Sequence, residues 1–176
     1  MKRLIILGSG GYGHTVADVA THLGYKCVFL DDAIPAHPLS SFTEYIPANL
    51  TSTQCDDTAE QVEFIVAFGN NAFRMQWIEK ITAGGGKLAT LIHPNAYVSP
   101  TATIYPGTVI LPNAVINTDT VIERGCIINL GAIVDHGCVI EEGCHICLGA
   151  IVKGENRILA CTKIEAGVVV ERNEYK

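Results

Sequence analysis

The second half of the chain repeats an aliphatic residue every six positions. From Val98 onward each sixth residue is Ile or Val, without a miss, over thirteen positions: Val98, Ile104, Ile110, Ile116, Ile122, Ile128, Val134, Ile140, Ile146, Val152, Ile158, Ile164 and Val170. A small side chain stands four residues after each of these up to Val168, with Asn156 as the exception. Gly, Asn or Asp stands three residues after most of them. So regular a hexad predicts a stacked repeat rather than an irregular core.

The hexad predicts a left-handed parallel β-helix. Each unit forms one short strand, three strands close a triangular coil, and successive coils stack about 4.8 Å apart. β-branched side chains fill the prism, small side chains fit near its corners, and Gly or Asn tolerates the positive φ of each turn. We expect about four coils between Val98 and Val170. Cys126, Cys138 and Cys144 fall on the small-residue position, which predicts packing and not metal binding.

The first half of the chain has a different pattern. We place the boundary so that residues 1–90 form a small α/β unit and residues 91–176 the β-helix. The predicted strands are 3–7, 27–30, 62–68 and 88–92, and the predicted helices are 14–23 and 72–83, with a polar stretch over 33–60. Alternation of strands and helices predicts a small Rossmann-like parallel sheet.

A glycine-rich turn follows the first predicted strand. Gly8, Gly10, Gly11 and Gly13 lie between that strand and a helix in a G-x-G-x-x-G pattern. Backbone amides at such a helix N-terminus can hold a phosphate, whereas the structural alternative is a tight turn that lets the helix pack on the sheet. Ninety residues are too few for the double unit that NAD usually needs, so a nicotinamide-dependent oxidoreductase is a poor alternative.

Polar residues follow two further predicted strands. Asp31 and Asp32 come after the second strand, and Gly69, Asn70 and Asn71 come after the third. Ligands of parallel α/β sheets bind at the carboxyl ends of the strands, where the glycine turn also lies. These residues are therefore the candidate binding residues of the first unit.

Composition excludes several classes of partner. The net charge of −6 argues against nucleic acid, which needs a basic face. We expect no membrane contact, because no apolar run is long enough to span a bilayer and the apolar start is better explained as a first strand than as a signal peptide. Seven Cys without paired spacing predict reduced thiols and a cytoplasmic protein.

Two histidines of the repeat fall outside its core positions. His136 lies two residues after Val134 and His145 five after Ile140, so neither is needed to fill the prism. Their separation of nine residues is half a coil and sets them on different sides of one prism. Imidazole is a suitable general base near neutral pH, although a solvated surface His is an equal alternative for either position. A zinc site of the three-histidine kind is not expected from two histidines.

The chain resembles the NeuD/PglD-type hexapeptide-repeat sugar acetyltransferases, and within them the UDP-4-amino-sugar N-acetyltransferases. The resemblance rests on the glycine turn, the segments 29–32 and 68–71 with Arg74, the segment 91–94 and the sequence Val134-Asp135-His136. It covers nearly the whole chain and the order of its parts.

The resemblance implies a role for each matching residue. His136 would be the general base, His145 would contact the acetyl group of acetyl-CoA, Gly154 would offer its amide to the cofactor, and Asn129 would lie near the sugar. Relatives carry an acid directly after the catalytic His, whereas Gly137 stands there in this chain, so Asp135 becomes the acid that orients the imidazole. In the first unit Gly8, Gly10 and Gly11 would contact the pyrophosphate, Asp31 or Asp32 the base, and Gly69, Asn70 and Asn71 the ribose and phosphate side.

The implied activity is acetyl-CoA-dependent N-acetylation of a 4-amino-4,6-dideoxy sugar linked to UDP or dTDP, for bacterial glycan biosynthesis. The implied assembly is a homotrimer that binds acetyl-CoA between adjacent β-helices, without a metal. Two alternatives remain open: O-acetylation of a sialic-acid-type sugar with the same His136, and a sugar-nucleotide-binding protein that has lost catalysis.

Overall fold

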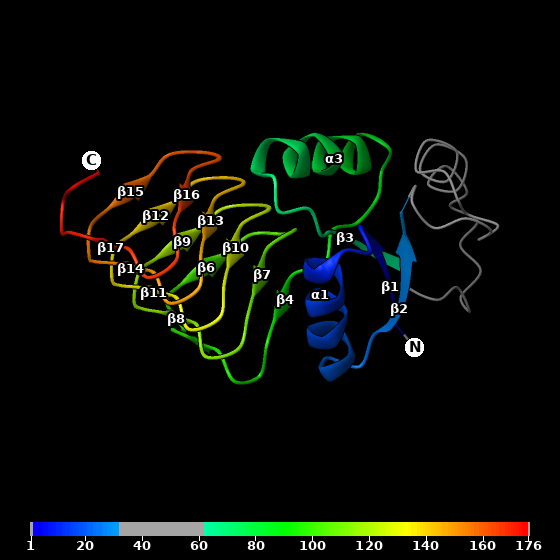
Figure 1. Ribbon diagram of the computed structural model, residues 1–176, viewed down its shortest axis with the longest axis horizontal. Helices are drawn as coiled ribbons and strands as arrows, with labels where there is room; N and C mark the ends of the chain where they lie inside the picture. Colours follow the sequence, from blue (N-terminus) through cyan, green and yellow to red (C-terminus); the bar gives the residue numbers. More distant parts are fainter. Residues whose placement is uncertain (1, 32–61, 176) are drawn as a thin grey trace. The chain divides into compact units, whose positions relative to one another are not determined.

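The computed structural model describes residues 2–31 and 62–175. Contacts divide the chain into two units, Met1–Ala89 and Thr90–Lys176, and the division falls one residue before the boundary drawn from the sequence. Figure 1 shows the first unit as a small sheet with helices and the second as a stack of coils. Neither helix of the described ranges is long and apolar enough to cross a membrane.

The first unit is built on a parallel sheet of three strands in the order β2-β1-β3. These strands are β1 (Arg3–Leu7), β2 (Lys26–Leu30) and β3 (Val62–Val66). Leu4 to Leu7 in the central strand are at most 1% exposed, as expected for a parallel strand covered on both faces. The predicted Rossmann-like α/β sheet is therefore present, and residues 32–61, which include Asp32 and the predicted polar stretch, lie outside the described residues.

Each of two strands leads directly into a helix. Helix α1 (Gly11–His22) follows β1, and helix α3 (Asn71–Ala83) follows β3. Helix α1 begins three residues before its predicted start, because Gly11 to Gly13 already belong to its first turn. Because β1 and β3 are parallel neighbours, the N-termini of both helices lie at the carboxyl edge of the sheet.

The predicted strand over 88–92 is wrong as a single element of the first sheet. Leu88 makes one isolated parallel bridge to Phe64, whereas Leu91–Ile92 forms β4 and pairs with β7 of the second unit. Ile92 stands six residues before Val98 and packs against the core of the second unit, so the hexad begins one repeat earlier than the sequence reading placed it.

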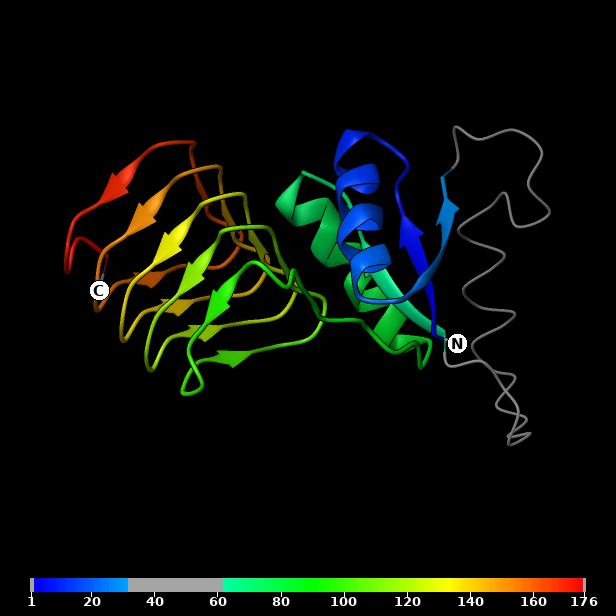
Figure 2. The same ribbon diagram turned by 90° about the horizontal axis from the view of Figure 1, so that it is seen from below.

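The second unit is a left-handed parallel β-helix whose two-residue strands form three sheets of five, five and four strands (Figure 2). Strands on the same side pair in parallel one coil apart, so that Ile128 pairs with both Ile110 and Ile146. The first sheet contains β4 (Leu91–Ile92), β7 (Val109–Ile110), β10 (Ile127–Ile128), β13 (His145–Ile146) and β16 (Lys163–Ile164). The second contains β5 (Tyr97–Val98), β8 (Val115–Ile116), β11 (Ile133–Val134), β14 (Ile151–Val152) and β17 (Val169–Val170). The third contains β6 (Thr103–Ile104), β9 (Val121–Ile122), β12 (Val139–Ile140) and β15 (Arg157–Ile158).

The residues of the hexad occupy the positions that the repeat predicts. The aliphatic series forms one core cluster, and Ile110 to Ile158 of that series are fully buried. Glycines of the turn series have positive φ, as do Asn113 and Asp119. The same conformation continues at Glu155, Cys161 and Asn173, where L-residues occupy a backbone region that favours Gly.

The small-residue position has a polar role that its size alone does not indicate. Cys126, Cys138 and Cys144 are 0% exposed, which confirms that they are packed. Each thiol also lies 3.0–3.3 Å from a backbone carbonyl fifteen residues further along the chain, as the hydroxyls of Thr108 and Thr120 do at 2.7–2.9 Å. These bonds satisfy carbonyls at the corners, where the sheet ladder is interrupted.

Asn156, the exception in the small-residue series, is buried and fully bonded. Its Nδ2 donates to the carbonyls of Lys153 and Glu171 at 2.8 Å, and its Oδ1 accepts from the backbone N–H of Tyr175 at 2.9 Å. Asn156 therefore ties the C-terminal segment to the last coils.

Candidate active site

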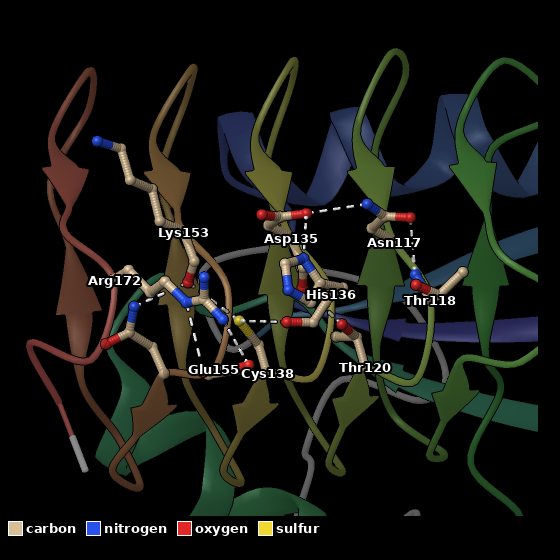
Figure 3. A network of polar contacts seen from close by, with 10 residues as sticks. Asn117, Thr118, Thr120, Asp135, His136, Cys138, Lys153, Glu155 and Arg172 are labelled. Atoms are coloured by element: carbon tan, nitrogen blue, oxygen red, sulfur yellow. Dashed lines mark hydrogen bonds and ion pairs between the residues drawn. The ribbon is translucent and has the colours of Figure 1, made fainter.

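Asp135 and His136 lie together at a corner of the β-helix (Figure 3). Asp135 directly follows β11, and its backbone N–H donates to Val152 at 2.9 Å, so its backbone still belongs to the ladder. His136 begins the turn, and Gly137 completes it with a φ of +64°. Because the chain turns at His136, the two adjacent side chains meet instead of pointing in opposite directions as they would along a strand.

The two side chains form an ion-pair or hydrogen-bond contact. His136 Nδ1 lies 3.1 Å from Asp135 Oδ1, with the side chains 46% and 36% exposed. The backbone N–H of His136, the amide of Asn117 and the imidazole all stabilise the carboxylate, and they lower the pKa of Asp135 to about 2. Asp135 is therefore ionised at neutral pH and holds Nδ1 as the protonated ring nitrogen, which leaves Nε2 as the basic one.

Gly154 lies against the ring of His136, one coil further along. A Cβ at Gly154 would be 2.6 Å from His136 Cε1, so only a glycine leaves room for the imidazole in this position. The sequence reading assigned the backbone amide of Gly154 to acetyl-CoA, and that role stays a prediction. The structure adds the close contact between Gly154 and the ring of His136.

Charged residues of the later coils surround the same corner. Arg172 Nη2 donates to Glu155 Oε1 at 2.6 Å, and the backbone N–H of Glu155 donates to the carbonyl of His136 at 3.0 Å. The guanidinium of Arg172 lowers the pKa of Glu155. Lys153 Nζ makes a 2.6 Å contact with Glu171. Sequence reasoning missed these residues, although their spacing of about one or two coils from His136 was the signal that could have found them.

His145 and Asn129 form a second polar pair on another side of the prism. Asn129 Nδ2 lies 3.0 Å from His145 Nε2, while Asn129 Oδ1 accepts from the backbone N–H of Leu130 at 2.8 Å. The fixed amide oxygen turns the Asn129 NH₂ toward the ring and favours Nε2 of His145 as the acceptor. His145 belongs to β13 and His136 follows β11, in different sheets, as their spacing predicts. One chain thus brings Asn129 together with His145 and not with His136.

The glycine turn of the first unit contains glycines of two kinds. A Cβ at Gly13 would lie 2.2 Å from the carbonyl oxygen of Gly8, and Gly8 itself has a φ of +105°. These two glycines allow α1 to approach the end of β1, which is the packing role. Gly10 and Gly11 have open space where their Cβ atoms would be, so a ligand could approach their backbone closely.

Asp31 fixes the conformation of this turn. Its Oδ2 accepts from both the backbone N–H and the hydroxyl of Ser9 at 2.7 Å. Asp31 thus has a structural partner in addition to its predicted role toward a nucleotide base, and Asp32 lies outside the described residues.

Asn70 and Asn71 also have structural partners. Asn70 Oδ1 caps α3 by accepting from Phe73 N at 2.9 Å, and Asn71 Oδ1 accepts from Arg74 Nη2 at 2.9 Å. Arg74 is 1% exposed and donates to the carbonyl of Phe68 at 2.9 Å. The side-chain oxygens of both asparagines hold the loop, and Gly69 has open space where its Cβ atom would be, so a ligand could approach its backbone.

The described ranges contain no cluster of three or more His, Cys, Asp or Glu that could hold a metal ion. A hexapeptide β-helix with an Asp–His pair at an exposed corner, joined in the same chain to a small βαβ unit with a glycine turn, defines the class of hexapeptide-repeat transferases.

Comparison with known proteins identifies the family within this class. The chain belongs to the PglB/PglD-type acetyltransferases. A family model described as the PglD N-terminal domain matches residues 3–81. The acetyltransferase domain of PglB from Neisseria gonorrhoeae FA1090 is 36% identical, with 98% of this chain and 84% of that chain covered and a TM-score of 0.87. The same domain in complex with acetyl coenzyme A matches with a TM-score of 0.83 and 35% identity, over 98% of this chain and 83% of that chain.

Two further relatives are more distant. PerB from Caulobacter crescentus, in complex with CoA and GDP-perosamine, is 26% identical with a TM-score of 0.78, over 98% of this chain and 90% of that chain. UDP-N-acetylbacillosamine N-acetyltransferase from Bacillus subtilis (strain 168) is 32% identical over 109 residues, which are 61% of this chain. The match covers 50% of the length of that curated relative.

The two kinds of glycine predict opposite effects of alanine. Gly13→Ala forces a Cβ onto the Gly8 carbonyl and should lower the free energy of unfolding by about 1–3 kcal/mol. Gly11→Ala meets open space in a helical turn and should leave stability unchanged or raise it by up to about 1 kcal/mol. If Gly11 approaches a phosphate, the same change should weaken UDP binding at least about tenfold. Urea unfolding and titration calorimetry measure the two effects, and equal destabilisation by both variants would contradict this division.

The contact between Gly154 and His136 predicts a specific coupling. The backbone of Gly154 lies outside the left-handed region, so Gly154→Ala should cost about 1–3 kcal/mol only through the clash with the imidazole. In a His136→Ala background that cost should vanish. A double-mutant cycle by urea unfolding measures the coupling, and a cost that persists without the ring would place its origin elsewhere.

Proposed function

We propose that this chain is an acetyl-CoA-dependent N-acetyltransferase for nucleotide-linked amino sugars, with His136 as the general base. The observation that carries the proposal is the contact between Asp135 and His136 at an exposed corner of the β-helix, 3.1 Å between Oδ1 and Nδ1. The finer proposal is that the acceptor is the 4-amino group of a 4-amino-4,6-dideoxy sugar on UDP or dTDP, used in bacterial glycan biosynthesis.

The residues at the corner match the needs of thioester aminolysis. His136 Nε2 removes the proton from the sugar amine as the nitrogen forms its bond to the acetyl carbon. The carbon–sulfur bond then breaks, the electron pair leaves with the CoA thiolate, and the thiolate takes the proton from the imidazolium. The products are an amide and the CoA thiol, and His136 is again a neutral base. Ionised Asp135 stabilises the imidazolium that forms in this step. A backbone N–H at the corner or on a neighbouring chain would stabilise the tetrahedral oxyanion.

The relatives favour amino-sugar N-acetylation over the alternatives. The curated relative from Bacillus subtilis is named as an N-acetyltransferase of a UDP-linked sugar, and the relative from Caulobacter crescentus holds CoA and GDP-perosamine. Asp135 supplies a carboxylate to His136 although Gly137 stands where the resemblance implies an acid, which argues against a protein that has lost catalysis. The open Gly10, Gly11 and Gly69 at the carboxyl edge of the first sheet are the residues we propose for the nucleotide.

A trimer would complete the site. His136 and His145 lie on different sides of one prism, and a neighbouring β-helix would bring the side that carries His145 next to the side that carries His136.

The outward-facing residues of the second sheet are all apolar: Tyr97, Val115, Ile133, Ile151 and Val169. Tyr97, Ile133 and Val169 are 55%, 36% and 45% exposed, whereas the outward positions of the other sheets include His145, Lys163, Thr103 and Arg157. Ile133 lies two residues before Asp135 on the same outward face, so the proposed interface adjoins the Asp–His pair.

The role of His136 as the general base is tested by measuring thiol release from acetyl-CoA. Wild-type protein should release CoA thiol only when a UDP- or dTDP-linked 4-amino sugar is added, and His136→Ala should lower turnover at least about 100-fold. Asp135→Asn should lower it by a similar factor. Because the pKa of Asp135 is about 2, Asp135 stays ionised from pH 6 to 9, and its own titration should add no pH dependence to the wild-type turnover in this range.

The control for this experiment is His22→Ala, on the exposed surface of α1, which should turn over like wild type. GDP- and CMP-linked sugars complete the panel of acceptors. Nucleotide binding without thiol release from any acceptor would support the binding-only alternative, and release only with hydroxyl acceptors would support O-acetylation.

The trimer is tested by mass in solution. Wild type should have three chain masses by light scattering, and Ile133→Glu should dissociate it by placing a charge in the apolar ladder. Thr21→Glu, on exposed α1, is the matched control that should leave the mass unchanged. A monomeric wild type, or a trimer that tolerates Ile133→Glu, would contradict the proposed interface.

A further inference from the structure

Asn117 lies one coil before Asp135 and contacts the carboxylate that faces His136. Asn117 Nδ2 donates to Asp135 Oδ1 at 2.9 Å, and this is the same oxygen that lies 3.1 Å from His136 Nδ1. The three residues therefore form one chain of contacts, Asn117 to Asp135 to His136 (Figure 3). The parallel pairing of β8 with β11 produces this placement, because the residues that follow paired strands are stacked.

The orientation of the Asn117 amide is fixed by a second bond. The backbone N–H of Thr118 donates to Asn117 Oδ1 at 2.8 Å. Because a backbone N–H needs an acceptor, the carbonyl oxygen of the amide must face Thr118 and the NH₂ must face Asp135. Asn117 thus presents a donor, and no charge, to the carboxylate.

The backbone of Asp135 is held independently of Asn117. The Thr120 hydroxyl donates to the Asp135 carbonyl at 2.7 Å, and the Asp135 N–H donates to Val152 at 2.9 Å. These bonds hold the main chain of Asp135 in place without Asn117. The side chain of Asn117 therefore acts only on the orientation of the Asp135 carboxylate.

We propose that Asn117 is a positioning residue for the general base, which it aligns through Asp135. This inference rests on the proposed function of His136. With Oδ1 anchored by Asn117, Asp135 accepts from Nδ1–H of His136 and keeps Nε2 unprotonated and directed away from the carboxylate. Without the anchor the carboxylate can rotate, and the imidazole loses its preference for the Nδ1–H tautomer.

The lack of charge on Asn117 matters for the His136 imidazole, as does the hydrogen bond from Asn117 to Asp135. The charged groups of the later coils that act on the Asp–His pair are Glu155 and Arg172, which are paired with each other. Lys153 of the same coils is paired with Glu171. The earlier coil contributes the neutral Asn117 and Thr118. A carboxylate at position 117 would add a negative charge on this side and would favour the protonated imidazole.

Two variants separate the effect of losing the Asn117–Asp135 hydrogen bond from the effect of adding a negative charge at position 117. Asn117→Leu removes the donor with little change of volume, and Asn117→Asp replaces the donor with an anion of the same shape. The control is Glu123→Gln, at the equivalent position of the following hexad, where Glu123 Oε2 accepts from the backbone N–H of Glu142 in the next coil. Circular dichroism and mass in solution check that all variants keep the fold and the assembly of the wild type.

The first readout is the tautomer of His136 and needs no turnover. In ¹⁵N spectra of the full chain with labelled histidine, assigned with His136→Asn, wild type should show the Nδ1–H tautomer at alkaline pH. Asn117→Leu should show a mixture of both tautomers. Asn117→Asp should show the doubly protonated ring up to a higher pH than wild type, and Glu123→Gln should match wild type.

The second readout is kinetic. Asn117→Leu should lower kcat about 10- to 100-fold and change the KM for acetyl-CoA less than about twofold, because misalignment of a catalytic group affects the reaction step. Asn117→Asp should move the acidic limb of the kcat/KM profile to higher pH, because His136 stays protonated up to a higher pH. Above that limb the variant should regain much of its activity. Glu123→Gln should keep the wild-type values.

The outcomes distinguish this inference from the proposed function. Wild type without turnover on any acceptor would contradict the proposed function, while the tautomer spectra would still test the role of Asn117. A wild-type tautomer and pH profile retained in both Asn117 variants would overturn the inference. Loss of activity in Asn117→Leu with an unchanged tautomer and an equal rise in KM would also overturn it, by assigning Asn117 to substrate binding.

Discussion

The parallel hydrogen bonds between successive coils are the constraint on which the rest of the second unit depends. Each strand contributes only two residues, so no strand is stable alone, and the ladders that join Ile110, Ile128 and Ile146 hold the coils in register. An exact repeat of eighteen residues per coil keeps the aliphatic residue of every hexad inside the prism. A single insertion within a strand would turn that strand's core residue outward. The donors at the small-residue position, such as Thr120 and Cys138, bond the corner carbonyls that the ladders leave unpaired.

The same register builds the corner that carries Asp135 and His136. Because residues one coil apart are stacked, His136 has Thr118 on one side and Gly154 on the other, and Asp135 has Asn117 beneath it. Room for the imidazole comes from the missing side chain at position 154, and the anchor of the carboxylate comes from the earlier coil. A prism with a hydrocarbon interior can carry such a site only on its outer corners, where polar groups contact each other and water.

The first unit exposes backbone groups at the carboxyl edge of its sheet in a different way. Its parallel strands direct their carboxyl ends and the N-termini of α1 and α3 to the same edge, and close packing of α1 on the sheet requires glycine at positions 8 and 13. Gly10 and Gly11 are not needed for that packing. The unit therefore has exposed backbone N–H groups on a rigid base, and Asp31 and Arg74 fix the loops that carry them.

The hexad by itself determined the β-helix, its buried cysteines and its positive-φ turns, because a period of six leaves one way to place β-branched side chains inside and glycines at corners. It also determined that His136 and His145 lie on different sides of a prism. The resemblance carried by a few short motifs was needed to connect the repeat with acetyl transfer. Three features were decided only by the tertiary structure: the contact of Gly154 with His136, the pairing of Asn129 with His145, and the bond from Asn117 to Asp135. Neighbours along a strand point in opposite directions, so the alternation of a strand alone does not bring Asp135 and His136 together. They meet because the chain turns at His136, where side-chain directions depend on the backbone angles of the folded coil and on the residues stacked one coil away.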